Sequence, residues 1–320
     1  MKIDLKKLSQ EIINGKKIDK ETALLLLDAD LDTLCQEADK IRAAFMANKV
    51  NLCSIISGIE GRCSEDCKFC AQSGHNKCNC DVHSLLPDET VIAAAKANAN
   101  AGVKRFAMVN SGRCPSAADF ERIISIYEKM SREVDINLCC SLGFLTNEQF
   151  IRLKNAGVKY VHCNLESSRN YFEKVCSTHS YDEKIENIRR AKAAGLNVCS
   201  GGIIGMGESW MDRIDMAFEL RALDIKSIPV NTLVPIPGTP FENIKRISEN
   251  DILRCIAIYR FINPDADIRL AGGRILMKDN GKKAFSCGAS ASITGNMLTT
   301  SGATIKEDMA MLKELGRIVS

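Results

Sequence analysis

The sequence predicts an α/β protein of the (β/α)8 TIM barrel type. Short β-rich runs alternate with amphipathic stretches along most of the 320 residues, which gives about eight βα units. Three amphipathic stretches end in Ala-Gly, and an aliphatic residue follows each time. These alanines are Ala101, Ala156 and Ala194. Glycine in the left-handed conformation ends a helix, and the aliphatic residue then begins a strand. A doubly wound sheet is the alternative, since strand order cannot be deduced from this pattern.

The N-terminal part differs from the rest. Leu5, Leu8 and Ile12 recur at helical spacing, so we expect helices there. We divide the chain into an N-terminal helical extension, residues 1–47, and a barrel domain, residues 48–320. The expected strands are 50–57, 105–110, 136–142, 160–166, 197–204, 227–233, 268–271 and 289–292. The expected helices begin near Asp88, Ala117, Asn147, Tyr181, Ser209 and Ser248.

Composition excludes several classes of protein. The 43 Lys and Arg nearly balance the 40 Asp and Glu, which argues against a nucleic-acid-binding surface. No apolar run approaches the roughly 18 residues that a membrane span needs. The N-terminal segment carries the acidic residues Asp4 and Glu11, which a signal peptide would not be expected to contain. We therefore expect a cytoplasmic protein with neither nucleic acid nor membrane as a partner. The odd count of 15 cysteines favours a reducing compartment and metal chemistry over a disulfide scaffold.

The most specific cysteine pattern follows the first expected strand. Cys63, Cys67 and Cys70 are spaced by four and three residues. Three such thiolates can hold one face of a [4Fe–4S] cluster and leave the fourth iron open to a small molecule. A zinc site is the alternative, with a fourth ligand from a nearby residue; the candidates are His75, Cys78 and Cys80. The position at the carboxyl end of a barrel strand favours the iron–sulfur interpretation.

This cysteine motif, with Phe69 before its last cysteine, resembles the radical S-adenosylmethionine (SAM) superfamily. From Val50 to Thr300 the chain resembles more specifically the biotin synthase family. The matching stretches are NLESS at 164–168, VCSGGIIGMGE at 198–208, IPVNTL at 228–233, GTP at 238–240, RLAGGR at 269–274 and LTT at 298–300. Together they are far more specific than the cysteine triple.

The resemblance implies a reaction and its cofactors. Such enzymes bind SAM at the open iron of the [4Fe–4S] cluster and cleave it with one electron to a 5′-deoxyadenosyl radical. Biotin synthases use this radical on dethiobiotin and insert sulfur from a second iron–sulfur cluster inside the barrel. The resemblance thus also implies an electron donor such as flavodoxin or ferredoxin, and a homodimer.

The resemblance also assigns residues to the two small molecules. Cofactor-binding roles fall on Phe69 beside the adenine, Glu166, Lys184 facing the SAM carboxylate, and Gly202 near the nucleoside. Substrate-binding roles fall on Asn164, Asn231, Thr299 and Thr300. Amide side chains both donate and accept, which suits a ureido ring, and the threonines would bind the carboxylate tail.

Each of these assignments has a plainer alternative. Lys184 replaces an arginine common in the family and could be a solvated helix charge, and Glu166 is one methylene longer than the family's aspartate. Thr299 and Thr300 could form an ordinary turn. The glycine run around Gly202 could suggest dinucleotide binding, but it lacks the full fingerprint.

The second cluster is where the chain departs from the family pattern of three cysteines and an arginine. Cys139, Cys199 and Arg269 match three of these positions, but Ala107 occupies the remaining cysteine position and cannot bind iron. We hypothesise a second cluster with a rearranged ligand set, [2Fe–2S] as in the family or larger. The additional ligand candidates are Cys78, Cys80, Cys163 and Cys287. Strand alternation points Cys140 away from Cys139 and disfavours Cys163 if Asn164 faces inward.

Two other functions stay open at this point. Another radical SAM enzyme of the same group, of the methylornithine synthase or hydrogenase maturase type, shares the architecture, and the former needs no sulfur-donating cluster. Ala107 favours that alternative, whereas Cys139, Cys199 and Arg269 oppose it. A non-catalytic iron–sulfur redox module would need no polar side chains at several strand ends.

Overall fold

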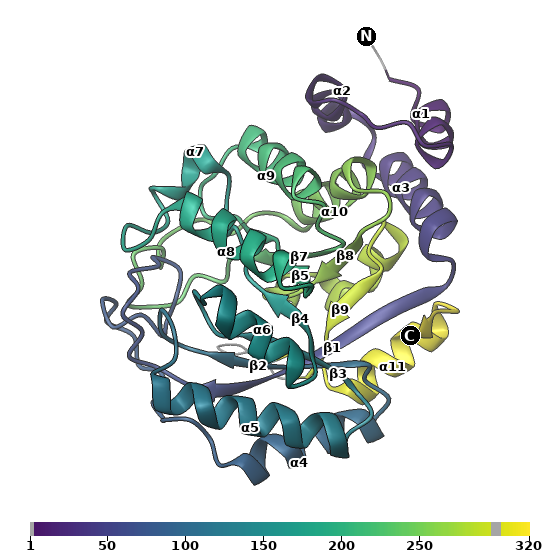
Figure 1. The fold of residues 1–320 in the computed structure, drawn as a ribbon. Coiled ribbons are helices and arrows are strands. Elements are labelled where there is room, and N and C mark those ends of the chain that lie inside the picture. Colours follow the sequence, from purple (N-terminus) through teal and green to yellow (C-terminus); the bar gives the residue numbers. More distant parts are fainter. Residues whose placement is uncertain (1–2, 296–301) are drawn as a thin grey trace.

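The strands form a closed parallel barrel. A computed structural model describes residues 3–295 and 302–320 of the chain, and Figure 1 shows the barrel with its helices outside. In the described residues the ring runs through β1 (Lys49–Ile59), β2 (Arg105–Asn110), β3 (Asn137–Ser141), β4 (Val158–His162), β5 (Asn197–Cys199), β7 (Ser227–Thr232), β8 (Asp267–Leu270) and β9 (Ala291–Ile293). Parallel pairing of β9 with β1 closes the ring, with Cys53 opposite Ile293. This closure confirms the (β/α)8 barrel and rules out the doubly wound sheet.

Two short strands lie outside the ring. β6 (Gly202–Ile204) continues β5 after a break and pairs with β7, so the single strand expected at 197–204 is split. The break lies at Ser200 and Gly201, and β7 pairs with the strands on both sides of it. β10 (Ile318–Val319) pairs with the start of β1, which brings the C-terminal end of the chain against the first strand.

The six helices begin at or within one residue of the positions that the sequence predicts, and hydroxyl side chains cap five of them; the helix at Asp88 instead follows Pro87. The oxygens of Ser116, Thr146, Ser180, Ser209 and Ser248 accept backbone N–H groups in the first turns of their helices. The helices around the barrel are α4 (Asp88–Asn100), α5 (Ala117–Glu133), α6 (Asn147–Asn155), α7 (Arg169–Phe172), α8 (Tyr181–Ala193), α9 (Trp210–Ala222), α10 (Glu249–Ile262) and α11 (Ile305–Glu314). The glycines that follow α4, α6 and α8 all have positive φ, as the repeated Ala-Gly phrase predicts.

Helices also precede the barrel, as expected. They are α1 (Leu5–Ile13), α2 (Lys20–Leu25), the 3₁₀ turn η1 (Leu26–Asp28) and α3 (Leu31–Met46). α3 packs against α10, and the buried residues of both belong to one continuous apolar core. The proposed division at residue 47 therefore stays a prediction. None of the helices in the described ranges has the length and apolar content to cross a bilayer.

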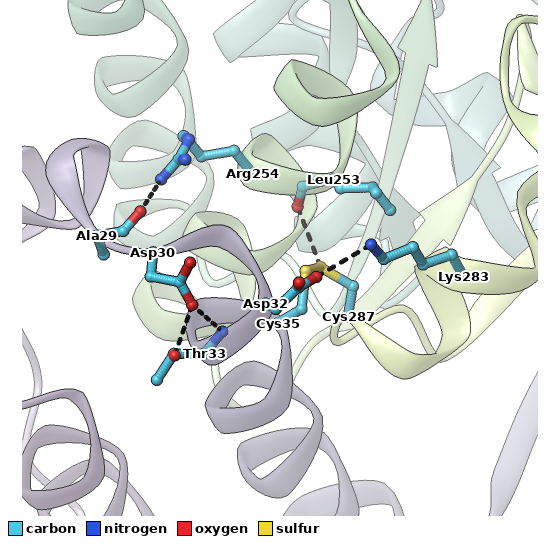
Figure 2. The surroundings of a disulfide bond; sticks show 9 residues. All are labelled: Ala29, Asp30, Asp32, Thr33, Cys35, Leu253, Arg254, Lys283 and Cys287. Atoms are coloured by element: carbon cyan, nitrogen blue, oxygen red, sulfur yellow. Dashed lines mark hydrogen bonds and ion pairs between the residues drawn. A yellow bond between two sulfur atoms is a disulfide. The ribbon is translucent and has the colours of Figure 1, made fainter.

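The C-terminal part of the chain contains two 3₁₀ segments, η2 (Arg274–Leu276) and η3 (Lys278–Ser286). A disulfide joins Cys35 of α3 to Cys287, which directly follows η3, so it ties the N-terminal helices to the chain before β9 (Figure 2). Nearby, Arg254 of α10 donates to the carbonyl oxygen of Ala29 at 2.8 Å. This region holds the extension and the barrel together.

Candidate active site

A cavity of about 430 Å³ opens at the carboxyl ends of the strands and continues into the barrel. Its lining divides into two groups of side chains. The first, here called the rim, lies at the mouth and comprises Cys63, Cys67, Phe69, Cys70, Glu166 and Lys184. The second, here called the interior group, comprises strand residues Cys53, Arg105, Ala107, Cys139, Cys199 and Arg269. Asn164 and Asn231 also line the cavity.

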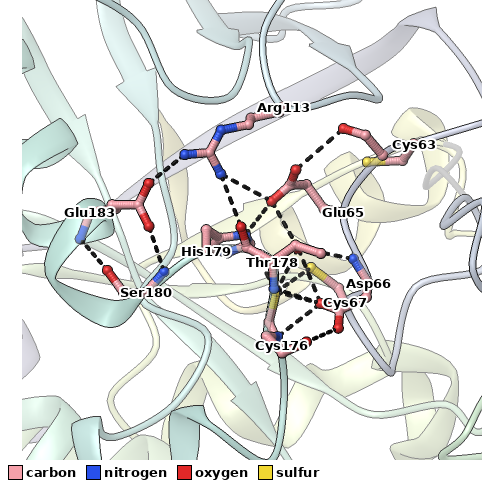
Figure 3. A network of polar contacts seen from close by, with 12 residues as sticks. Cys63, Glu65, Asp66, Cys67, Arg113, Cys176, Thr178, His179, Ser180 and Glu183 are labelled. Atoms are coloured by element: carbon pink, nitrogen blue, oxygen red, sulfur yellow. Dashed lines mark hydrogen bonds and ion pairs between the residues drawn. The ribbon is translucent and has the colours of Figure 1, made fainter.

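The loop that carries the rim cysteines is anchored by its two acidic residues (Figure 3). The Asp66 carboxylate accepts the backbone N–H groups of Ser177 and Thr178 at 2.8 and 3.1 Å. Burial opposes ionisation, but these bonds and those from the Ser177 hydroxyl and the Cys176 thiol hold the pKa of Asp66 well below its usual value. The loop is thus fixed to the segment that follows α7.

Glu65 makes a second, more buried anchor in Figure 3. Its carboxylate lies 2.5 Å from Nδ1 of His179 and accepts the Thr178 hydroxyl at 3.0 Å. Arg113 reaches the same carboxylate at 3.4 Å. Although burial raises the pKa of Glu65, these partners lower it below its ordinary value. The loop between Cys63 and Cys67 is therefore held by contacts that do not involve a metal.

Another cysteine lies beside the rim. The Sγ atom of Cys176 is 3.8 Å from that of Cys67 and 3.3 Å from Nδ1 of His179. The hydrogen bond from Cys67 is the main cause that lowers the pKa of Cys176 to about 4, while the same bond and burial raise the pKa of Cys67. The ligand atoms of the three residues lie within 4.8 Å of one another. The sequence pattern did not reveal Cys176, since it lies over a hundred positions from the motif.

Lys184 points into the cavity from α8 and is only 8% exposed. Its ammonium group lies 5.8 Å from the ring centroid of Phe144 and 5.9 Å from that of Phe172. Burial lowers the pKa of Lys184, but the Glu166 carboxylate and nearby thiols raise it above its ordinary value. The alternative that Lys184 is a solvated surface charge is wrong, because the side chain is buried against these rings.

Polar residues lie just after β4 and near the end of β7. Asn164 accepts the N–H of Gly201 at 3.0 Å and donates to the Glu166 carboxylate at 3.4 Å. Asn231 donates to the carbonyl oxygen of Gly202 at 3.1 Å and accepts the N–H of Gly272 at 2.9 Å. These bonds hold both amides at the cavity wall, while each retains hydrogen-bonding capacity for a ligand.

Gly202 has a structural reason to be glycine. A Cβ atom there would meet the Glu166 carbonyl oxygen at 2.6 Å and the Met216 sulfur at 2.4 Å. Gly202 is not among the residues that line the cavity, so its contact with a nucleoside stays a prediction. Phe69 does line the cavity, and it packs against the small apolar group that includes Val175, Ile203 and Met206.

The interior group places thiols next to positive charge. Cys139 on β3 and Cys199 on β5 are 3% and 5% exposed. Burial raises the pKa of both thiols; for Cys199 the hydrogen bond with His162 and the charges of Arg269 and Arg105 outweigh burial and lower the pKa to about 6. Cys199 is also 3.2 Å from the Ser227 hydroxyl.

Two buried arginines complete this group. The guanidinium of Arg105 stacks 3.6 Å from the centroid of the Tyr160 ring. Arg269 donates to the carbonyl oxygens of Asn51 and Ser292 at 3.1 and 3.0 Å. Among the described residues, the Nε atoms of both arginines have no hydrogen-bond partner. Buried thiols beside two guanidinium groups that each keep an unpartnered Nε–H among the described residues fit an anionic iron–sulfur cluster.

The structure corrects the additional ligand candidates. Cys287 is bonded to Cys35 in the disulfide of Figure 2, which overturns it as an iron ligand. Cys78 donates to the carbonyl oxygen of Pro237 at 3.3 Å, and neither it nor Cys80 lines the cavity. Cys163 does line the cavity and accepts the amide N–H of Asn187 at 3.4 Å. Thr299 and Thr300 lie outside the described residues.

Sequence reasoning also missed Cys53 and Arg105, which lie opposite one another on β1 and β2. Both are in expected strands. Cys53 lies two residues before Ile55 and Arg105 two residues before Ala107, so each shares a strand face with a residue that lines the cavity. Alternation could therefore have identified them as inward-facing. What it could not supply is the register that brings Cys53 beside the matched cysteines.

Two family models match the chain. Residues 59–220 match the radical SAM superfamily, and residues 229–318 match the Biotin and Thiamin Synthesis associated domain. The first covers the rim, Asn164 and Cys139, and the second covers Asn231, Arg269 and the C-terminal strands. Residues 221–228, between the two matches, run from the end of α9 to the first residues of β7.

Solved structures and curated sequences extend this likeness over the whole chain. A methylornithine synthase structure matches with a TM-score of 0.86 at 20% identity, covering 98% of this chain and 97% of its own. A maturase of the [FeFe]-hydrogenase matches with a TM-score of 0.84 at 19% identity, covering 99% of this chain and 75% of its own. At such identities these matches establish the fold alone.

The curated relatives are much closer in sequence. The biotin synthase of Brachyspira hyodysenteriae is 52% identical over 98% of this chain and 94% of its own length. The biotin synthase of Clostridium beijerinckii is 50% identical over 98% of this chain and 99% of its own. The chain therefore belongs to the biotin synthase family of the radical SAM superfamily.

Proposed function

We propose that this enzyme converts dethiobiotin to biotin by radical SAM sulfur insertion. One observation carries the proposal: a single cavity connects the three-cysteine rim to a separate buried group of cysteines and arginines. A radical that forms at the rim and a sulfur donor inside the barrel must both reach one substrate, and this cavity is continuous between the two groups. Membership of the biotin synthase family supports the same reaction.

At the rim, Cys63, Cys67 and Cys70 would hold a [4Fe–4S] cluster through their thiolates. When bound there, the cluster and SAM supply the electron transfer and the radical that no side chain provides. Lys184 would neutralise the SAM carboxylate from its buried position, and Phe69 would pack against the adenine. The roles of Glu166 and Gly202 follow from the family resemblance, with Glu166 facing the ribose or the substrate.

The substrate would lie between the two groups. Asn164 and Asn231 are held at the wall with donor and acceptor capacity for the ureido ring. Thr299 and Thr300 would bind the carboxylate tail. The apolar part of the lining, which includes Ile55, Val109 and Ile293, suits an aliphatic chain and excludes water from reactive carbon.

The interior group would hold the second cluster, [2Fe–2S] as in the family or larger. Cys139, Cys199 and Arg269 are the ligands that the resemblance assigns, and all three line the cavity. We further propose a cytoplasmic homodimer that receives electrons from a flavodoxin or ferredoxin and that uses neither nucleic acid nor membrane.

The decisive experiment incubates the reconstituted protein anaerobically with SAM, dithionite and dethiobiotin. We expect biotin and 5′-deoxyadenosine together. Deoxyadenosine without biotin would instead favour an isomerase of the methylornithine synthase type, which Ala107 makes the second candidate. Neither product from a protein with an intact reduced cluster would leave only a redox module.

A further inference from the structure

Cys53 occupies a place in the barrel that none of the family assignments uses. It lies on β1, opposite Arg105 on β2 and Ile293 on β9, and it is 6% exposed. With Ala107 and Cys139 it forms a small buried group distinct from the main core. Its side chain lines the same cavity as Cys199 and Arg269. The thiol therefore faces the region where a second cluster would lie.

Ala107 explains why a thiol on β1 can serve here. In the β1–β2 register Arg105 is opposite Cys53 and Ala107 is opposite Ile55, so Cys53 and Ala107 are diagonal neighbours on adjacent strands. Adjacent strands are only about 4.8 Å apart. A methyl group at Ala107 leaves the space that a thiol would fill. The interior group then contains Cys53, Cys139, Cys199 and Arg269, which keeps the family's count of three cysteines and one arginine.

Two buried arginines of the cavity wall lie near this position. Burial raises the pKa of the Cys53 thiol, whereas the charges of Arg269 and Arg105 act in the opposite direction and so favour a thiolate. The thiol of Cys53 donates weakly to the carbonyl oxygen of Ser54 at 3.6 Å. A buried thiol that faces two guanidinium groups and other thiols is better explained as a ligand than as an inert core residue.

The other cysteines are less suitable. Cys287 is bonded to Cys35, and Cys78 and Cys80 do not line the cavity. Cys140 lies on the other face of β3 in the main core. Cys163 lines the cavity but packs against the main core and contacts Asn187 of α8.

We infer that Cys53 is the cysteine ligand of the second iron–sulfur cluster in place of the one missing at Ala107. The inference rests on the second cluster of the proposed function. Cys53 would bind iron as a thiolate and release its proton on binding, with no change in oxidation state. The ligand has thus moved from β2 to the neighbouring strand while the other ligands keep their places.

The test compares iron and sulfide content with Mössbauer spectra in anaerobically reconstituted wild type, C53A, C163A and C140A. We expect wild type, C163A and C140A to hold the same iron in excess of four per chain, and C53A to hold only the four irons of the rim cluster. The electron paramagnetic resonance signal of the reduced rim cluster, and its change with SAM, should persist in C53A. Circular dichroism checks that C53A is folded.

A rescue separates a ligand from a structural residue. The double variant C53A/A107C returns the thiol to β2 and should recover the second-cluster iron and its spectrum. If C53A retains all its iron, or C163A loses the second cluster instead, the inference fails while the proposed function stands. If C53A loses both clusters and A107C rescues neither, Cys53 is structural. Wild type with only four irons would overturn the second cluster itself.

Discussion

The rim and the interior group are built in different ways. The rim cysteines lie on one loop, which Asp66 and Glu65 fix to residues 176–179 by hydrogen bonds that need no metal. The interior side chains come from β1, β2, β3, β5 and β8, and only the register of the closed barrel brings them together. A ligand on the loop cannot move without destroying the motif. A ligand inside the barrel can move to the next strand and still reach the same iron.

The largest effect should come from a rim cysteine. In C70A the thiolate count at the rim falls to two, so we expect loss of the [4Fe–4S] cluster and of all SAM cleavage. Iron quantitation and deoxyadenosine formation measure this. Because Cys114 is exposed, C114A is the matched control and should retain both. Substantial deoxyadenosine formation by C70A would mean that Cys176 substitutes as a ligand.

The interior group should depend more on barrel stability than the rim does. The buried pair Arg274–Asp308, at 2.7 Å, supports β9, because Arg274 also donates to the Ser292 hydroxyl at 2.9 Å and the Ile293 carbonyl at 3.1 Å. Leaving one partner of a buried pair uncompensated costs about 3 kcal/mol. We expect D308N to lower the free energy of unfolding by that amount in urea titrations.

The control for D308N is a variant that breaks a solvent-exposed ion pair instead of a buried one. E133Q breaks the exposed ion pair with Lys96 on the barrel surface and should leave unfolding unchanged. In D308N, reconstitution of the second cluster should fall before that of the rim cluster, because β9 pairs with β1 at Cys53. Equal losses at both groups would show that the rim depends on the barrel as much as the interior does.

A smaller effect should follow from neutralising Lys184. K184Q removes a buried cation and should weaken SAM binding about 10- to 100-fold, the equivalent of about 1.5–3 kcal/mol for a charged hydrogen bond. K184R retains the charge and supplies the guanidinium group that is common in the family and binds a carboxylate with two parallel hydrogen bonds. Most of the affinity for SAM should therefore remain. Titration of SAM against the spectrum of the reduced cluster measures both. Unchanged affinity in K184Q would remove Lys184 from the SAM site.

The same contrast explains what the sequence could predict. The helix starts at Ala117 and Asn147 depend on the local caps of Ser116 and Thr146, so they could be located to a residue. The sequence could equally predict Cys63, Cys67 and Cys70, because their chemistry depends on their spacing along one loop. The split of 197–204 into β5 and β6 was not, since it results from contacts with β4 and β7.

The interior group could be predicted only in part. The resemblance identifies Cys139 and Cys199, but the predicted substitutes for Ala107 all lie near the loop or the strand ends. Cys53 lies more than 50 positions before Ala107, and only the β1–β2 register places it beside that residue. Cys287 was predicted as a candidate iron ligand, and its separation of 252 residues from Cys35 gave no sign of the disulfide that joins them.

The smallest effect tests whether the loop itself is as independent of the metal as its hydrogen bonds suggest. E65Q keeps the shape of the side chain but removes the charge that faces His179 and Arg113. Residues that orient metal ligands typically change affinity by 10–100-fold, and because the amide oxygen still accepts hydrogen bonds we expect about tenfold. The rate at which an anaerobic chelator removes iron should therefore rise about tenfold at the rim cluster only.

E148Q, at an exposed helix start, is the control. Faster loss from the second cluster as well would mean that the two groups, separate in construction, are coupled through the cavity wall.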